Sequence, residues 1–333
     1  MPLLTQTKGT TPLTQCADSI CGEVAPARDM QDADASKKRI GFVGLGTMGG
    51  SMAVHLHKHS LSTRSVPALV HNRSPEKALA HASEHGTVAI ADLATLASRC
   101  DVICACLSTT ADVTAVFERL PLERGTLIID ATSGDPEGTR ALGESLRARG
   151  VRLVDAPVSG GPKGAVAASL TSMMGGDDAD VEAARQYIGA GSGKMVQCGP
   201  LGAGDAVKAV NNMLNTAHLL LATEGLLALQ RAGVAPATAL DVINSSSGGS
   251  TQTARYPTYV LSRSFDYGFA LPLLRKDVGI AAGLAADGAT LFPEVHRLIE
   301  AAEAQLGPGA DYTEIAKLLM YSYPGLRGRS RHE

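Results

Sequence analysis

The chain has 333 residues, of which 44% are hydrophobic and 4% aromatic, with 36 glycines, no tryptophan and a net charge of −3. This length suits two domains, and the apolar share is sufficient for a sizeable core. The small net charge, without a broad basic region, argues against nucleic acid or an anionic membrane as the main partner. No apolar run reaches the roughly 18 residues that a membrane span needs, so we expect no membrane partner.

The two ends of the chain differ in composition from the rest. Residues 1–38 contain polar clusters with little periodicity, which predicts a flexible N-terminal tail, and residues 326–333 are typical of a basic C-terminal tail. The first 38 residues lack a secretory apolar stretch and are too acidic for an organelle transit peptide. The six cysteines form no CxxC pair or zinc-type cluster, so we expect no metal site, a reducing compartment and a cytoplasmic location.

From residue 39 onward, strand-like and helix-like segments alternate. Apolar strand-like segments begin at residues 39, 67, 87, 101, 125, 151 and 169, and helical segments separate most of them. Such alternation predicts a parallel α/β sheet with helices on both faces. We therefore expect a doubly wound, Rossmann-type domain over residues 39–199.

After residue 199 the pattern becomes purely helical, which predicts an all-helical domain over residues 200–325. Its first helix spans about 30 residues, or roughly 45 Å at 1.5 Å per residue. A helix of that length can join both domains. The apolar helical half also favours a homodimer in which the C-terminal domains pack together.

A glycine motif follows the first predicted strand. The segment GFVGLGTMGG carries Gly44, Gly46 and Gly49 in the pattern GxGxxG, directly before a helix. The first glycine permits a tight turn, the second lets the backbone approach a pyrophosphate, and the third allows close helix–strand packing. Free N–H groups at the helix N-terminus attract phosphate. We therefore predict a dinucleotide site that also includes the intervening Leu45, Thr47 and Met48.

The end of the second predicted strand indicates which dinucleotide binds. NAD sites usually place an acidic residue there, but this chain has Asn72, Arg73 and Ser74. Arg73 can pair with a 2′-phosphate, and its two neighbours can add hydrogen bonds. We predict NADP(H) in preference to NAD(H), with an ordinary solvated surface arginine as the alternative interpretation of Arg73.

Three further motifs follow GLGTMG in order: DAPVSGG at residues 155–161, GPLGAGDAVKAVNN at 199–212 and LLRKDVGIA at 273–281. Together they resemble the β-hydroxyacid dehydrogenases. That family includes 3-hydroxyisobutyrate, tartronate semialdehyde, L-threonate and succinic semialdehyde/glyoxylate-type enzymes. The resemblance covers about residues 39–320.

The resemblance implies roles for the matching positions. It implies a catalytic lysine, Lys208, and an amide one turn later, Asn212. The SGG segment matches the substrate-binding residues Ser159, Gly160 and Gly161. The positions that match cofactor contacts are Leu107, Ser108, Ser133 and Lys276; Ser108 replaces a proline and Ser133 a threonine of the usual motifs.

The helical spacing supports the same lysine. Lys208 and Asn212 are four residues apart and share one helix face, beside a second stripe with Asn211 and Asn215. Burial of a lysine is costly and lowers its pKa, which proteins rarely sustain without function. A lysine that reaches solvent at a domain edge is the alternative. We expect Lys208 to be the general acid–base of hydride transfer to or from a small β-hydroxy acid or the matching semialdehyde.

Several alternatives remain open at this point. Lys276 and Asp277 form either a cofactor contact or an ordinary surface ion pair, and residues 245–257 form either a loop that closes over the substrate or a plain linker. The competing functions are an imine-reducing relative, which usually lacks the catalytic lysine, and a catalytically silent NADP-binding interaction module. Lys208, Asn212 and the SGG segment argue against both.

Overall fold

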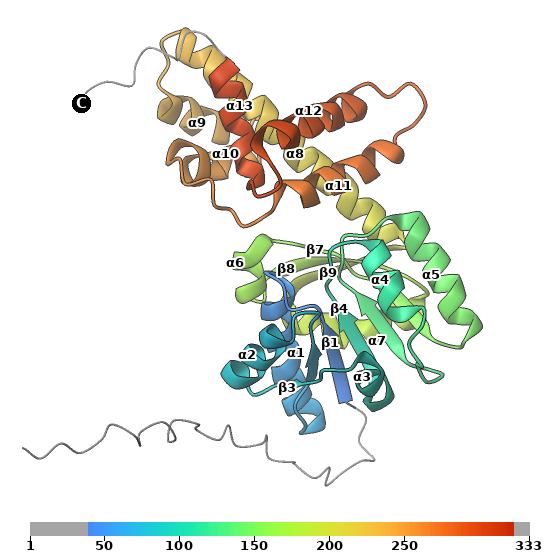
Figure 1. Ribbon diagram of the computed structural model, residues 1–333. Coiled ribbons are helices and arrows are strands. Elements are labelled where there is room, and N and C mark those ends of the chain that lie inside the picture. Colours follow the sequence, from blue (N-terminus) through green and yellow to red (C-terminus); the bar gives the residue numbers. More distant parts are fainter. Residues whose placement is uncertain (1–38, 323–333) are drawn as a thin grey trace, which may run out of the picture. The chain divides into compact units, whose positions relative to one another are not determined.

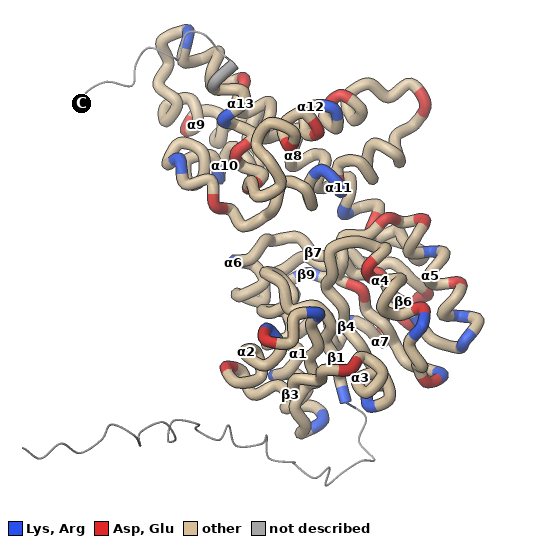
Figure 2. The backbone as a smooth tube through the Cα atoms, in the orientation of Figure 1, with Lys and Arg blue, Asp and Glu red and all other residues tan. Residues whose placement is uncertain are grey.

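The computed structural model describes residues 39–322, so the tails predicted at residues 1–38 and 326–333 lie outside the described residues. The described part contains a mixed sheet with its helices, followed by a purely helical half (Figure 1). Its acidic and basic residues are interspersed along the chain (Figure 2). None of its helices is long and apolar enough to cross a membrane.

The sheet of the described part has nine strands. Their order is β3-β2-β1-β4-β5-β6-β8-β7, with β9 paired to β8. Pairs among β1 to β6 are parallel, whereas β8 runs antiparallel to β6 and β7. The strands are β1 Arg39–Val43, β2 Leu69–His71, β3 Val88–Ala89, β4 Cys100–Ala105, β5 Leu127–Asp130, β6 Arg152–Asp155, β7 Val158–Ser159, β8 Leu170–Gly175 and β9 Ser192–Gly199.

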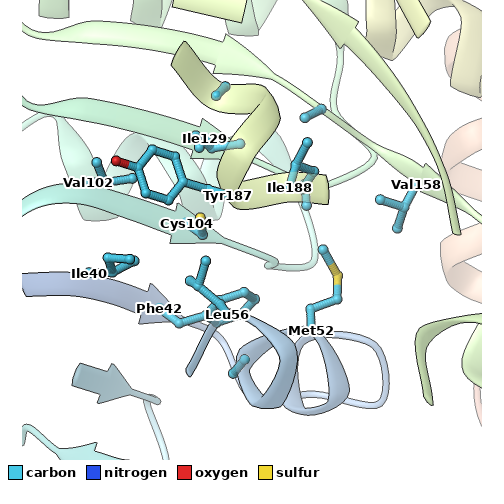
Figure 3. Close-up of a cluster of buried hydrophobic side chains, with 14 of the residues drawn as sticks. Ile40, Phe42, Met52, Leu56, Val102, Cys104, Ile129, Val158, Tyr187 and Ile188 are labelled. Carbon is cyan, nitrogen blue, oxygen red and sulfur yellow. The ribbon is translucent and has the colours of Figure 1, made fainter. Parts of the chain in front are cut away.

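Helices cover both faces of this sheet, as a doubly wound fold requires. Alternate residues of the central strands point to opposite faces, so Cys104 joins the core beneath α1 and α7, and Ile103 joins the core beneath α3, α4 and α5. Figure 3 shows the first of these cores. The helices of this half are α1 Gly49–Arg64, α2 Pro75–His85, α3 Leu93–Arg99, α4 Thr110–Phe117, α5 Pro136–Ala148, α6 Gly161–Val166 and α7 Asp178–Ile188. The predicted Rossmann-type architecture is confirmed.

The remaining helices surround a long one. Helix α8 has 29 residues, contacts β8 near its start and packs against α10, α11 and α13 farther along. These helices bury a third core of their own. Their bounds are α8 Ala203–Arg231, α9 Pro236–Asn244, α10 Thr251–Tyr256, a π-helical turn Pro257–Leu261, α11 Leu271–Gly283, α12 Leu291–Leu306 and α13 Ile315–Ser322.

Residues 245–257 differ from the sequence-based expectation of a loop. Their second half is helix α10, and Ser250 caps its start. The Ser250 hydroxyl accepts a hydrogen bond from the Thr253 N–H at 3.1 Å, and the Ser250 N–H donates to the Thr253 hydroxyl at 2.7 Å. This reciprocal capping starts a helix in a Ser/Gly-rich segment whose composition predicts a loop.

Candidate active site

The glycine motif has the geometry that a bound pyrophosphate requires. Gly44 has φ +98°, and a Cβ there would lie 2.3 Å from the Cys106 carbonyl oxygen. A Cβ on Gly49 would lie 2.0 Å from the Gly44 carbonyl oxygen, whereas one on Gly46 would meet nothing within 4 Å. No side chain caps the α1 N-terminus and no acid lies in its first turn. The motif is therefore tightly packed on two sides and open beside Gly46, which fits a phosphate group.

The end of β2 is joined to this loop through Asn72. Its side-chain oxygen accepts a hydrogen bond from the Leu45 N–H at 2.9 Å, and its amide donates to the Ser74 carbonyl at 3.2 Å. Arg73 between them is exposed, and no residue within 39–322 forms a hydrogen bond or ion pair with its side chain. The structure thus leaves the Arg73 side chain exposed, next in sequence to the residue that bonds to the glycine loop.

The carboxyl ends of β4 and β5 carry the next predicted contacts. The Leu107 N–H donates to the Thr132 hydroxyl at 2.9 Å, and the Thr132 N–H donates to an Asp130 carboxylate oxygen at 3.0 Å. Ser108 is exposed, and the Ser133 carbonyl accepts a hydrogen bond from Lys276. The sequence motifs did not identify Thr132 or Asp130, although both lie at the carboxyl end of the buried parallel strand β5, where ligands of such sheets bind.

Lys208 belongs to a buried chain of polar side chains. Its Nζ donates to Asn212 Oδ1 at 3.1 Å, and Asn212 Nδ2 donates to Asp277 Oδ2 at 2.6 Å. Asp277 Oδ1 lies 2.9 Å from Lys276 Nζ as an ion pair, although it is not aligned as a hydrogen bond. Lys208 is 8% exposed and Asp277 is 2% exposed. Lys276 and Asp277 therefore do form an ion pair, but its carboxylate is buried, so it is not an ordinary surface pair.

The surroundings of Lys208 favour its neutral form relative to a solvated lysine. Burial lowers the pKa of the Lys208 ammonium; the Asp277 carboxylate opposes this by raising the pKa, and Lys276 lowers it further. An amine with a lowered pKa, held by one amide, gives up its proton more readily than a solvated lysine and can take it back. This is the combination that a general acid–base needs.

The other two amides of α8 have different partners. Asn211 Nδ2 donates to Asn212 Oδ1 at 3.3 Å, so it helps to orient that amide. Asn215 Oδ1 accepts a hydrogen bond from Gln252 Nε2 of α10 at 2.5 Å. This hydrogen bond therefore links α10 to α8.

The SGG segment lies where β7 ends and α6 begins. Gly160 has φ +140° and Gly161 has φ +68°. A Cβ on Gly161 would lie 2.5 Å from the Tyr267 hydroxyl oxygen, which in turn accepts a hydrogen bond from Arg255 Nη1 at 3.1 Å. Tyr267 and Arg255 come from the helical half; Arg255 belongs to the 245–257 segment that the sequence offered as a possible substrate loop, whereas no sequence motif includes Tyr267.

Two buried carboxylates attach the start of α8 to the sheet. Asp155 accepts hydrogen bonds from the N–H groups of Gly202 and Asp205 at 2.7 and 2.9 Å. Asp205 accepts from the Gly134 N–H at 2.9 Å, and burial, then the neighbouring Asp155, raise its pKa to about 8. These bonds hold the helix turn that precedes Lys208. Among residues 39–322, no group of three or more His, Cys, Asp or Glu side chains could hold a metal ion.

Comparison with known proteins agrees with this arrangement. Residues 39–199 match a family profile described as the NAD-binding domain of 6-phosphogluconate dehydrogenase. Residues 202–319 match one described as NAD-binding of NADP-dependent 3-hydroxyisobutyrate dehydrogenase. Both matches follow the boundary between the sheet and the helical half.

Individual relatives cover most of the chain. A 2-(hydroxymethyl)glutarate dehydrogenase of Eubacterium barkeri is 32% identical over 261 residues, 77% of this chain and 85% of that protein. The human mitochondrial 3-hydroxyisobutyrate dehydrogenase is 31% identical over 259 residues, 74% of this chain and 75% of that protein. The 3-hydroxyisobutyrate dehydrogenase of Mycobacterium tuberculosis, solved with L-serine, superimposes with a TM-score of 0.76 at 28% identity, over 85% of this chain and 99% of that one. This chain therefore belongs to the β-hydroxyacid dehydrogenase family of NAD(P)-dependent oxidoreductases.

Proposed function

We propose that the protein catalyses reversible, NADP(H)-dependent hydride transfer between a small β-hydroxy acid and the matching semialdehyde or keto acid. The observation that carries this proposal is the buried chain from Lys208 through Asn212 to Asp277. The activities for which the relatives are named, 3-hydroxyisobutyrate and 2-(hydroxymethyl)glutarate dehydrogenation, support the substrate class.

Residues of this chain bind the substrate and transfer its proton. The backbone N–H groups of Gly160 and Gly161, with the Ser159 hydroxyl, bind the substrate carboxylate. In the oxidation direction the neutral Lys208 amine accepts the proton of the substrate hydroxyl. In the reduction direction its ammonium donates that proton and polarises the carbonyl. Asn212 orients Lys208, because the two side chains are hydrogen-bonded at 3.1 Å.

The sheet half provides the residues that would hold the cofactor. The glycine loop, with Leu45, Thr47 and Met48, would bind the pyrophosphate, since its open side lies at Gly46. Leu107, Ser108, Ser133 and Lys276 would line the adjoining part, of which the Lys276 contact with the Ser133 carbonyl is already formed. When bound, the nicotinamide accepts or supplies the hydride.

The preference for NADP(H) is assigned to Arg73. Its guanidinium is exposed beside Asn72, and no described residue competes for it. A charge-assisted bond to a 2′-phosphate contributes about 1.5–3 kcal/mol, so Arg73→Ala is expected to lower kcat/KM for NADPH at least tenfold more than for NADH. A wild-type protein that prefers NADH tenfold would refute this assignment.

A substrate panel tests the function itself. Small C3–C4 β-hydroxy acids and semialdehydes, each assayed with NADP(H) and NAD(H), are expected to include a substrate whose turnover requires Lys208. Turnover of a cyclic imine alone would instead support the imine-reducing alternative. NADPH binding, followed by fluorescence, with no turnover of any hydroxy acid would support the silent binding module.

We also propose a homodimer formed through the helical half. Val207, Leu214 and Leu221 recur every seven residues along α8 and are 44%, 47% and 67% exposed. Such a stripe of apolar side chains on a long helix is typical of a surface that another copy covers. Light scattering should give twice the chain mass for the wild type and a lower mass for Leu221→Glu; a monomeric wild type would contradict the proposal.

A further inference from the structure

We infer that the substrate carries a second carboxylate, and that Arg255 and Lys163 bind it beside the SGG segment. The inference rests on the proposed function, since it specifies the substrate class of the same site. It starts from two tyrosines of the helical half that lie against the substrate-binding turn.

The Tyr267 side chain contacts both Arg255 and the turn formed by the SGG segment. Its hydroxyl oxygen would lie 2.5 Å from a Cβ on Gly161, so the phenol faces the backbone that binds the first carboxylate. Arg255 Nη1 donates to the same hydroxyl at 3.1 Å, and its guanidinium carbon lies 5.3 Å from the Tyr267 ring centroid. The Tyr267 side chain therefore lies between the Arg255 guanidinium and Gly161.

Lys163 provides a second cation near the SGG segment and Tyr267. It follows Gly161 by two residues in α6, and its Nζ lies 5.4 Å from the Tyr259 ring centroid. The rings of Tyr259 and Tyr267 meet edge to face with centroids 5.3 Å apart. The two cations thus flank one pair of aromatic rings next to the SGG segment.

Neither cation is neutralised within the described part of the chain. No carboxylate among residues 39–322 forms an ion pair with Arg255 or Lys163. The comparably half-buried Arg64, by contrast, pairs with Asp101 at 2.5 Å. A half-buried guanidinium whose bonded partner is a neutral phenol keeps donors available for a ligand.

The cluster is also fixed relative to the catalytic helix. The Tyr267 ring packs edge to face on Tyr312, whose hydroxyl is 3.0 Å from Gln252 Nε2, and the same amide donates to Asn215 on α8. Asn215 is one turn beyond Asn212. Arg255 lies one turn beyond Gln252 on α10, so it is held by the same contacts that orient α10 on α8.

The chemistry of these groups selects an anion rather than a neutral substituent. A guanidinium offers a planar fork of donors that matches a carboxylate, and an ammonium adds a point charge. A β-hydroxy acid with one carboxylate satisfies the SGG segment and leaves both cations without a counter-charge. A dicarboxylic β-hydroxy acid neutralises both ends of the site.

Matched substrates test this directly. The dicarboxylates 2-(hydroxymethyl)succinate and 2-(hydroxymethyl)glutarate are compared with 2-(hydroxymethyl)butanoate and 2-(hydroxymethyl)pentanoate, in which a methyl group replaces the second carboxylate. We expect kcat/KM with NADP⁺ to be at least tenfold higher for the better dicarboxylate than for its matched monocarboxylate. A ratio within threefold of one for both pairs would overturn the inference.

Variants assign the preference to the two cations. Arg255→Gln is expected to lower the dicarboxylate-to-monocarboxylate ratio at least tenfold, and Lys163→Gln to lower it by a smaller factor. Arg231→Gln is the matched control, because Arg231 is exposed and lies 23 residues after Lys208 on α8, about 35 Å away. An Arg255→Gln ratio equal to that of the wild type would overturn the assignment.

A binding measurement separates this inference from the proposed function. Calorimetric titration of the full chain with each dicarboxylate, with and without NADP⁺, requires no turnover. Absence of turnover on every hydroxy acid, together with dicarboxylate binding that Arg255→Gln weakens tenfold, would refute the reaction and retain the anion site. Turnover of monocarboxylates with no measurable dicarboxylate binding would retain the reaction and refute the site. If Arg255→Gln does not fold, Lys163→Gln alone must lower the ratio at least threefold.

Discussion

Replacing Gly49 by alanine should damage the protein, although a Gly→Ala change in a helix ordinarily stabilises it. Gly49 is the first residue of α1, where alanine has the better intrinsic propensity by up to about 1 kcal/mol. The new Cβ, however, would lie 2.0 Å from the Gly44 carbonyl oxygen and 3.2 Å from the Phe42 ring. The nearest atom belongs to the backbone, so a change of side-chain rotamer cannot relieve the overlap.

The magnitude follows from these opposing effects. Overpacking of a well-packed position costs about 1–3 kcal/mol. Because a 2.0 Å contact forces the backbone to move, we take the upper part of that range and expect a net loss of about 2 kcal/mol. The moving carbonyl belongs to the glycine loop, so NADPH binding should weaken at least tenfold as well.

The neighbouring Gly50 provides a matched control for the same assay. A Cβ there would meet nothing within 4 Å, so Gly50→Ala should keep or raise stability by up to about 1 kcal/mol. Urea unfolding of the two variants, with NADPH titrations by fluorescence, measures both effects. The reasoning is refuted if Gly49→Ala is as stable as the wild type, or if the two substitutions shift stability equally.

Two further predictions concern the pH dependence of buried carboxylates. Asp277→Asn removes the charge that raises the pKa of Lys208, so the pH midpoint of kcat/KM for oxidation should move to lower pH; an unmoved midpoint would count against that role. Asp205 keeps its proton in the folded state up to about pH 8, whereas an unfolded aspartate loses it near pH 3.9. Its contribution to stability is therefore fully present below about pH 4 and is lost as the pH rises through 8. Asp205→Asn should flatten the loss of unfolding free energy between pH 4 and 8, and curves that stay parallel to the wild type would contradict this.

Local patterns predicted a large part of the fold. The GxGxxG spacing, the 29-residue helix α8 and the i, i+4 pair Lys208/Asn212 each depend on residues close in the chain, so periodicity and motif spacing specify them. Strand β9 carries a weaker signal, because many of its residues are half-buried or exposed and its apolar pattern is interrupted. It was not among the predicted strands.

The partners of the candidate site depend on contacts between distant segments. Asp277 is hydrogen-bonded to Asn212, which lies 65 residues earlier in the chain. The Asp277 carboxylate is buried because α11 packs on α8. Tyr267 lies against Gly161 across more than 100 residues, in a segment whose composition predicts no fixed position. Helical periodicity identifies which face of α8 is polar, but it contains no information about which residue of another helix meets that face.

The claim that Lys208 is the general acid–base is tested most directly by the chemical step in Lys208→Met, a variant of similar length without the amine. General acid–base catalysis contributes about 10²–10⁴-fold. Single-turnover reduction with saturating NADPH and the best substrate of the panel should slow by at least a hundredfold, with the dissociation constant for NADPH within threefold of the wild type. A rate within tenfold of the wild type at unchanged NADPH affinity would contradict the assignment.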